Sequence, residues 1–144
     1  MGVDIDGWIE VNFGFNGHGY WEGFAQIKHL ADRNYGLFGG FFGVRNADEF
    51  IPLAANRGIP ADASADVNIH QEPLNCNSSW ILWSEIEQVD WQERAARAFP
   101  PDDQPLTREN TVTPGWRIIF TIMEALATRY GGQRVRLVVW FDSE

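Results

Sequence analysis

The chain has 144 residues and a mass of 16.4 kDa, and its 44% hydrophobic content is enough to fill one core, so we expect a single domain over residues 1–144. Twenty acidic residues against eleven basic residues give a net charge of −9. This charge repels phosphate backbones and argues against direct binding of nucleic acid.

The first element is a strand over residues 3–13, where polar and apolar residues alternate with a period of two. One face carries Val3, Ile5, Ile9 and Val11, and the other carries Asp4, Asp6, Trp8 and Glu10. The pattern predicts a half-buried strand. Asn16-Gly17 predicts a turn, after which residues 20–27 return as the second strand of a hairpin.

A helix is predicted over residues 33–44, with Asp32 as its N-cap. Four glycines recur in it at helical spacing: Gly36, Gly39, Gly40 and Gly43. We favour close packing against a neighbouring element as their role. The alternative is a ligand that lies against exposed backbone.

Residues 47–77 show no period and predict one long ordered loop with at most a helical turn, which makes the segment a candidate site region. A short apolar run follows at residues 80–83. Ser84 and Glu87 then stand at capping-box spacing and predict a helix to about Ala98, ended by Pro100-Pro101. Residues 102–110 are interpreted as an exposed connector.

The last helix is predicted over residues 114–130, with Thr113 as cap, Pro114 at the first helical position and Gly131 at the end. Its apolar face holds Trp116, Ile119, Phe120, Met123, Ala127 and Tyr130. Residues 135–141 alternate again and predict a final strand. We therefore expect an α+β fold, with a small antiparallel sheet that includes both terminal strands, packed by about three helices.

No apolar run approaches the roughly 18 residues that a membrane span needs, and the N-terminus lacks a signal-peptide pattern, so we expect a cytoplasmic protein. The single cysteine, Cys76, cannot form an internal disulfide, which agrees with a reducing compartment. It also excludes a cysteine-rich zinc site.

Acidic side chains on the terminal strands are the first candidate site. Asp4 and Asp6 project from one face of a strand about 7 Å apart, and Glu10 continues their row. If the terminal strands are neighbours, Asp142 joins them, and converging carboxylates could hold Mg²⁺ or Mn²⁺ for phosphoryl chemistry. The alternative, which we favour, is a solvated face of an antiparallel sheet.

Three arginine–asparagine pairs are the second candidate, a clamp for an anionic ligand. Guanidinium and amide groups suit phosphate or carboxylate, and Tyr35 or Trp80 could stack a base. In an acidic protein, arginines more often pair with its own carboxylates, and this alternative is favoured. The pairs are Arg33 with Asn34, Arg45 with Asn46, and Arg57 with Asn56.

Catalytic motifs are absent from the sequence. The histidines His18, His29 and His70 are widely separated and form no helical zinc motif. No serine has the context of a hydrolase nucleophile, and neither common glycine-rich phosphate-binding motif occurs. We therefore lean towards a protein without enzymatic activity.

Several short blocks, in the same order along nearly the whole chain, resemble a family of small uncharacterised phage and prophage proteins that open Met-Gly-Cys-Asp-Ile-His. They are residues 1–6 (MGVDID), 33–38 (RNYGLF), 43–46 (GVRN), 57–60 (RGIP), 79–81 (SWI) and 139–142 (VWFD). This chain has Val3 and Asp6 where the family has cysteine and histidine, which argues against a shared transition-metal site. The resemblance implies a phage-type context, and then the host-cell cytoplasm.

The leading hypothesis is a non-enzymatic phage-type accessory protein. It would inhibit a host or defence protein by occupying a basic groove, or sequester a small phosphorylated ligand, without a cofactor. One alternative is a metal-dependent phosphoesterase or nuclease with Mg²⁺ or Mn²⁺. Another is an assembly component that forms a homo-oligomer through exposed Trp8 and Trp140.

Overall fold

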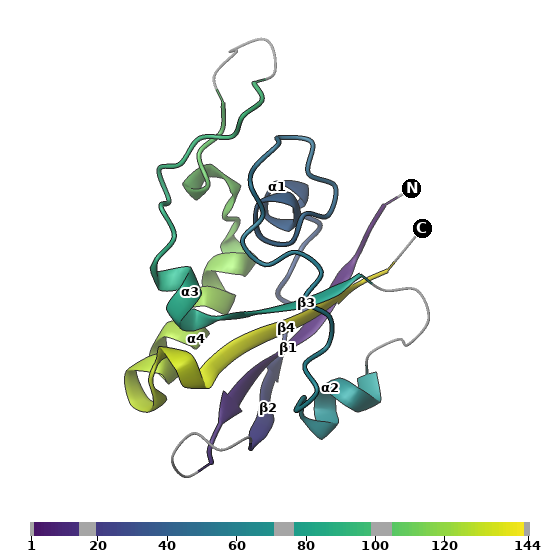
Figure 1. Cartoon of the computed structure of the whole chain (residues 1–144), viewed down its shortest axis with the longest axis vertical. Helices are drawn as coiled ribbons and strands as arrows, with labels where there is room; N and C mark the ends of the chain where they lie inside the picture. Colours follow the sequence, from purple (N-terminus) through teal and green to yellow (C-terminus); the bar gives the residue numbers. More distant parts are fainter. Residues whose placement is uncertain (1, 15–19, 71–76, 99–104, 143–144) are drawn as a thin grey trace.

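The protein is described by a computed structural model that covers residues 2–14, 20–70, 77–98 and 105–142. Its centre is a four-stranded antiparallel sheet of order β2-β1-β4-β3 (Figure 1). The fold is α+β and contains both terminal strands, as expected. The strands are β1 Ile5–Asn12, β2 Trp21–Gln26, β3 Ser78–Leu82 and β4 Val135–Phe141.

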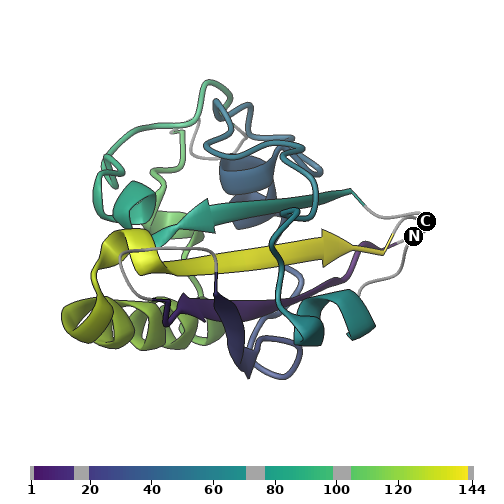
Figure 2. The ribbon, with the colours of Figure 1, turned by 60° about the horizontal axis from the view of Figure 1, so that its bottom comes forward.

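The two terminal strands are neighbours along their whole length. Ile5 of β1 lies opposite Phe141 of β4, and Val11 lies opposite Val135. Beyond the last pair, the Asp142 backbone N–H donates a 3.0 Å hydrogen bond to the Asp4 carbonyl. The two ends of the described part of the chain consequently lie side by side, at Asp4 and Asp142 (Figure 2).

The main core lies on the face of the sheet that packs against α4, Pro114–Tyr130. This helix begins at Pro114, and Gly131, at φ 96°, follows its end, as predicted. Trp116, Ile119 and Met123 of α4 are fully buried. The Thr113 side chain does not cap the helix; its hydroxyl donates to Asp32 at 3.0 Å instead.

The predicted helix over residues 33–44 is shorter than expected and has a different cap. It comprises α1, Tyr35–Leu37, continued by the π-helical turn η2, Phe38–Phe42. Asn34 is the N-cap in place of Asp32, because its side-chain oxygen accepts a 3.0 Å hydrogen bond from the Leu37 N–H. Gly43, at φ 75°, ends the element in the left-handed region that favours glycine.

A close approach explains one of the helical glycines. A Cβ atom added to Gly39 would lie 2.7 Å from the Cα of Asn46, so no larger residue fits without a backbone shift. The loop that makes this approach is folded back by Asn46, whose side chain bonds both the N–H and the carbonyl of Phe50. Close packing is therefore the role of Gly39, as we favoured.

The apolar run at residues 80–83 lies mainly in the edge strand β3 and leads into the short helix α3, Trp83–Glu87. The prediction of a helix to Ala98 was wrong. Glu85 occupies the capping position, accepting from the Leu82 N–H at 3.1 Å, and the chain leaves the helix after Glu87. It then pairs in antiparallel fashion with the segment before α4 through a bridge between Arg94 and Thr107.

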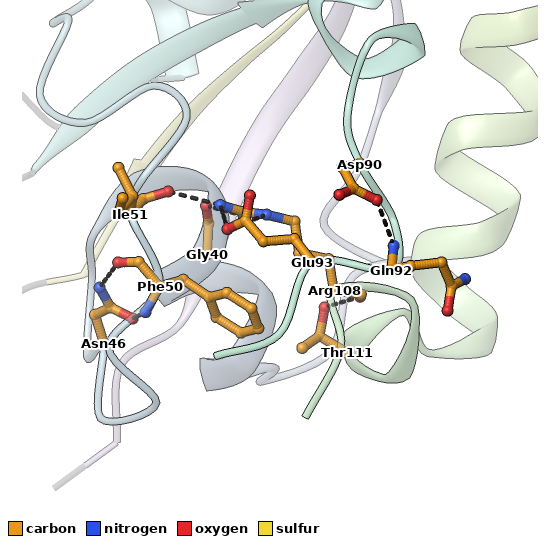
Figure 3. Close-up of polar contacts among 9 residues, drawn as sticks. All are labelled: Gly40, Asn46, Phe50, Ile51, Asp90, Gln92, Glu93, Arg108 and Thr111. Atoms are coloured by element: carbon orange, nitrogen blue, oxygen red, sulfur yellow. Dashed lines mark hydrogen bonds and ion pairs between the residues drawn. The ribbon is translucent and has the colours of Figure 1, made fainter. Parts of the chain in front are cut away.

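The expected exposed connector also contains a buried residue, Arg108, which is only 2% exposed. Its guanidinium donates to the carbonyls of Gly40 and Ile51, at 2.7 Å each, and to the Glu93 carboxylate at 2.9 Å (Figure 3). Arg108 thus joins three segments that are distant in the sequence. The 3₁₀ turn η3, Glu109–Thr111, follows it, and a second 3₁₀ turn, η4, Gly132–Arg134, links α4 to β4.

The second face of the sheet is covered by α2, Ala65–His70, which lies across the strands from α3 and α4 (Figure 1). Val67 of α2 packs with Val138 and Trp140 of β4. Our expectation of a solvated face is therefore wrong for most of its length. Glu10 is fully buried and Trp140 is 3% exposed, so Trp140 is not available for the surface patch that we considered.

Two predicted features, the turn at Asn16-Gly17 and the helix end at Pro100-Pro101, lie outside the described residues. Within the described ranges, no helix has both the length and the apolar character that crossing a membrane requires.

Candidate functional site

The pairing of β1 with β4 creates a concave surface at the chain ends, with a volume of about 450 Å³. We call it the acidic cavity. All three aspartates of the predicted metal site line it. Its charged lining residues are Asp4, Asp6, Asp32, Asp142, Lys28 and Arg33. The strand pairing on which this juxtaposition depended is thus present.

The carboxylates of Asp4 and Asp6 are hydrogen-bonded to other residues of the chain. Asp4 forms an ion pair with Arg33, with 2.6 Å between Arg33 Nε and Asp4 Oδ1. Asp6 accepts a 2.7 Å hydrogen bond from the Gly7 N–H and longer ones, at 3.4 Å, from the Gln26 amide. In the part of the chain that the structure describes, no group of three or more histidine, cysteine, aspartate or glutamate side chains could hold a metal ion.

The ion pair also fixes the electrostatics of Asp4. The hydrogen bond from Arg33, assisted by its positive charge, holds the pKa of the Asp4 carboxyl below its usual range. Both side chains are more than half exposed, so the pair contributes little to stability. Its main effect is to neutralise the one arginine at the acidic cavity.

Two further members of the predicted anion clamp, Tyr35 and Arg45, contact each other. The Tyr35 hydroxyl accepts a 3.1 Å hydrogen bond from the Val3 N–H, which attaches α1 to the segment before β1. The Arg45 guanidinium lies over the Tyr35 ring, 5.8 Å from its centroid. Tyr35 therefore stacks a cation of the chain on one side and keeps 37% of its surface exposed.

Two of the three asparagines of the clamp, Asn34 and Asn46, have structural roles. Asn34 is buried, caps α1 and donates from its amide to the Thr111 carbonyl and the Thr113 hydroxyl. Asn46 closes the loop to Phe50 through both of its polar atoms. The hydrogen-bonding groups of both amides are thus already used within the fold.

Arg57 and Trp80 lie together, at the edge strand β3. The Arg57 guanidinium makes a two-pronged contact with the Glu85 carboxylate, at 2.7 and 2.8 Å, and lies 4.7 Å from the centroid of the Trp80 ring. The hydrogen bond from Arg57 is the main reason that the pKa of Glu85 is lowered. The Arg57 guanidinium is therefore already bound by a carboxylate and an aromatic ring of the chain itself.

A buried network that the sequence reasoning missed lies beneath α2. Glu10 and Arg136, directly opposite each other on β1 and β4, form an ion pair of 2.6 Å. The Ser64 N–H donates to Glu10 at 2.7 Å, and Arg136 donates to Asp62 at 3.0 Å. In the sequence, only the alternation of polar and apolar residues marked Glu10 and Arg136, since it predicts on which face of the sheet they lie. It does not predict that the segment before α2 covers that face.

No protein-family model, curated protein or solved structure matches the chain. The resemblance to small phage proteins therefore stays a prediction, and functional inference rests on the residues of this chain and their contacts.

Proposed function

We propose that the chain is a non-enzymatic binding protein of phage or prophage type, which inhibits a host or defence protein by occupying a basic surface on it. The observation that carries the proposal is the acidic cavity. Its lining holds four aspartates against one lysine and one arginine, and the arginine is already bound to Asp4. A concave surface with this excess of negative charge attracts and orients a positively charged partner.

The contacts of the arginines support a basic partner over a phosphorylated ligand. Arg33 and Arg57, two of the three arginines in the clamp, hold carboxylates of the chain at 2.6 to 2.8 Å. A phosphate would have to displace these carboxylates from both guanidinium groups. The remaining alternative site, for a divalent metal, needs carboxylates that converge, whereas Asp4 and Asp6 are engaged by Arg33 and Gln26.

The test compares capture of proteins from a bacterial lysate by three immobilised forms of the full chain. The first is the wild type. The second carries Asp6→Asn, Asp32→Asn and Asp142→Asn, which neutralise the acidic cavity and leave the Asp4–Arg33 pair in place. The third is a control that neutralises exposed carboxylates elsewhere: Glu22→Gln, Glu49→Gln and Asp90→Asn.

We expect the wild type and the control to retain the same basic protein, identified by mass spectrometry, and the cavity variant to lose it. Retention of that protein by the cavity variant would contradict the proposal. Hydrolysis of nucleotides or nucleic acid by the purified chain with Mg²⁺ or Mn²⁺ would contradict the non-enzymatic assignment and favour the metal-dependent alternative.

A further inference from the structure

A second concave surface lies between α3 and α4, which are neighbours on the core side of the sheet (Figure 1). Its volume is about 430 Å³. We call it the α3–α4 cleft. Its lining combines large aromatic rings with glutamates: Trp83, Trp91, Phe120, Glu87, Glu109 and Glu124. None of these residues belongs to the acidic cavity.

Aromatic rings form the apolar part of the cleft. The ring centroids of Trp91 and Phe120 are 5.9 Å apart, and those of Trp83 and Phe120 are 6.4 Å apart. From behind, Phe41 stacks on Phe120 at 5.7 Å, which fixes the position of the central ring. Trp83 and Phe120 keep only 7% and 8% of their surface exposed and form the floor of the cleft, whereas Trp91 is half-buried and is the most exposed of the three rings. The face of such a ring carries partial negative charge and attracts cations.

Glutamates form the polar part. Glu109 forms an ion pair of 2.6 Å with Arg117, at the edge of the same cleft. Glu87 and Glu124 are exposed, and no basic side chain among the described residues forms an ion pair with either of them. The cleft therefore has two carboxylates without a cationic partner beside a fixed group of aromatic rings.

We propose that the α3–α4 cleft binds the side chain of an arginine or lysine in a basic segment of a partner protein. The alkyl part of such a side chain packs on the Trp91 ring of the cleft, while its charged head meets the carboxylates of Glu87 and Glu124. The attraction between a cation and an aromatic face grows as the cation is desolvated, which the concave shape of the cleft favours. The Arg117–Glu109 pair shows that the edge of the cleft already accommodates a guanidinium.

The inference goes beyond the proposed function, since it assigns a second contact site that uses different residues. Both surfaces select positive charge, but each has its own set of carboxylates. Neutralising one set leaves the other intact. The failure of one proposal is therefore distinguishable from the failure of the other.

The experiment is a nuclear magnetic resonance titration of the full chain that follows the tryptophan indole N–H signals. The probes are N-acetyl-arginine amide, N-acetyl-lysine amide and, as a neutral analogue of similar length, N-acetyl-norleucine amide. Trp83→Phe and Trp91→Phe assign the signals. Each probe is raised to about 50 mM, well above the millimolar range expected for a single side chain.

We expect the Trp83 and Trp91 signals to shift with the two cationic probes and not with norleucine; the stronger cationic probe identifies the preferred head group. The double variant Glu87→Gln and Glu124→Gln should weaken binding about tenfold. The matched control, Glu22→Gln with Glu49→Gln, should bind as the wild type does. The spectrum of each variant reports its fold directly.

Three results would overturn the proposal: equal shifts with norleucine, undiminished binding by a folded Glu87→Gln and Glu124→Gln variant, or no shift of the Trp83 and Trp91 signals with either cationic probe.

Discussion

Arg136 and Glu10 form an ion pair in which both side chains are buried: the Arg136 side chain is 5% exposed and that of Glu10 is fully buried. The two residues face each other across β4 and β1, and the Trp21 ring covers the guanidinium at 3.9 Å. Through Ser64 and Asp62, the same pair attaches the segment before α2 to the sheet. The ion pair therefore positions α2 over the second face of the sheet.

Removing one member of this pair is predicted to be strongly destabilising. Arg136→Met leaves the Glu10 carboxylate buried without its cation, and we expect a loss of about 3 to 5 kcal/mol in the free energy of unfolding. Glu10→Met should cost a similar amount. Because the uncompensated charge is gone in the double variant, its loss should be smaller than the sum of the two single losses.

Urea denaturation followed by tryptophan fluorescence measures these differences. Arg33→Met is the matched control, since it removes the exposed Arg33–Asp4 pair and should cost at most about 1 kcal/mol. A loss for Arg136→Met no larger than that for Arg33→Met would show that the buried pair does not contribute as argued.

Arg108 is predicted to require the geometry of a guanidinium, beyond its charge. Three acceptors surround it, the carbonyls of Gly40 and Ile51 and the carboxylate of Glu93. The single nitrogen of a lysine side chain cannot reach all three acceptors at once, so the buried Gly40 carbonyl or the partly buried Ile51 carbonyl loses its donor. We expect Arg108→Lys to lower the free energy of unfolding by about 2 to 3 kcal/mol, and Arg108→Met by more.

Urea denaturation again provides the measurement, with Arg94→Lys as control, because Arg94 is exposed and donates to a single carbonyl, that of Pro105. Wild-type stability in the Arg108→Lys variant would show that positive charge alone is sufficient at this position.

The periodicity of the sequence correctly predicted the strands and the helix that are determined by residues close together in the sequence. The alternation of residues 3–13 and 135–141 located both terminal strands, and Pro114 and Gly131 marked the ends of α4. These signals depend on residues a few positions apart. The shared location of Asp4, Asp6 and Asp142 was foreseen only as a consequence of strand pairing, which the structure provides.

Long-range contacts account for what the sequence did not reveal. Glu10 looks like a solvent-facing strand residue until the aperiodic segment at residues 59–70 packs over it. Arg108 lies in a region rich in prolines and charged residues, yet it is buried and donates hydrogen bonds to the carbonyls of two residues that are distant in the sequence. The α3–α4 cleft joins Trp83, Trp91 and Phe120 from separate segments, and no spacing rule connects them.

Gly39→Ala tests whether packing overrides helix propensity. Propensity alone predicts a gain of about 1 kcal/mol when alanine replaces a helical glycine. The new Cβ atom, however, would lie 2.7 Å from the Asn46 backbone, so we expect a loss of about 1 to 3 kcal/mol.

Gly40→Ala provides the comparison for Gly39→Ala. Its Cβ atom would meet side-chain atoms of Arg108 and Phe50, at 3.2 Å or more, and side chains adjust more easily than backbone. Thermal unfolding of both variants should therefore rank Gly39→Ala as the less stable. A variant Gly39→Ala that unfolds above the wild-type temperature would show that the contact relaxes without cost.

The pair Arg57–Glu85 is predicted to make stability depend on pH on the acidic side. The hydrogen bond from Arg57 outweighs the effect of burial and lowers the pKa of Glu85 in the folded state. The unfolded chain consequently binds the proton more readily, and the unfolding free energy rises with pH through this range. The contribution is complete above the unfolded glutamate value of about 4.3 and is lost as the pH falls through the lower folded pKa.

The measurement is the difference in unfolding free energy between the wild type and Glu85→Gln across the acidic range. This difference should be constant above about pH 6 and shrink as the pH falls below about 4.3, because the wild type then loses the charge that the variant never had. Arg57→Met removes the cation that lowers the pKa, so introducing Glu85→Gln into that background should remove most of the pH dependence of the difference. The same pH dependence with and without Arg57 would mean that another group is responsible.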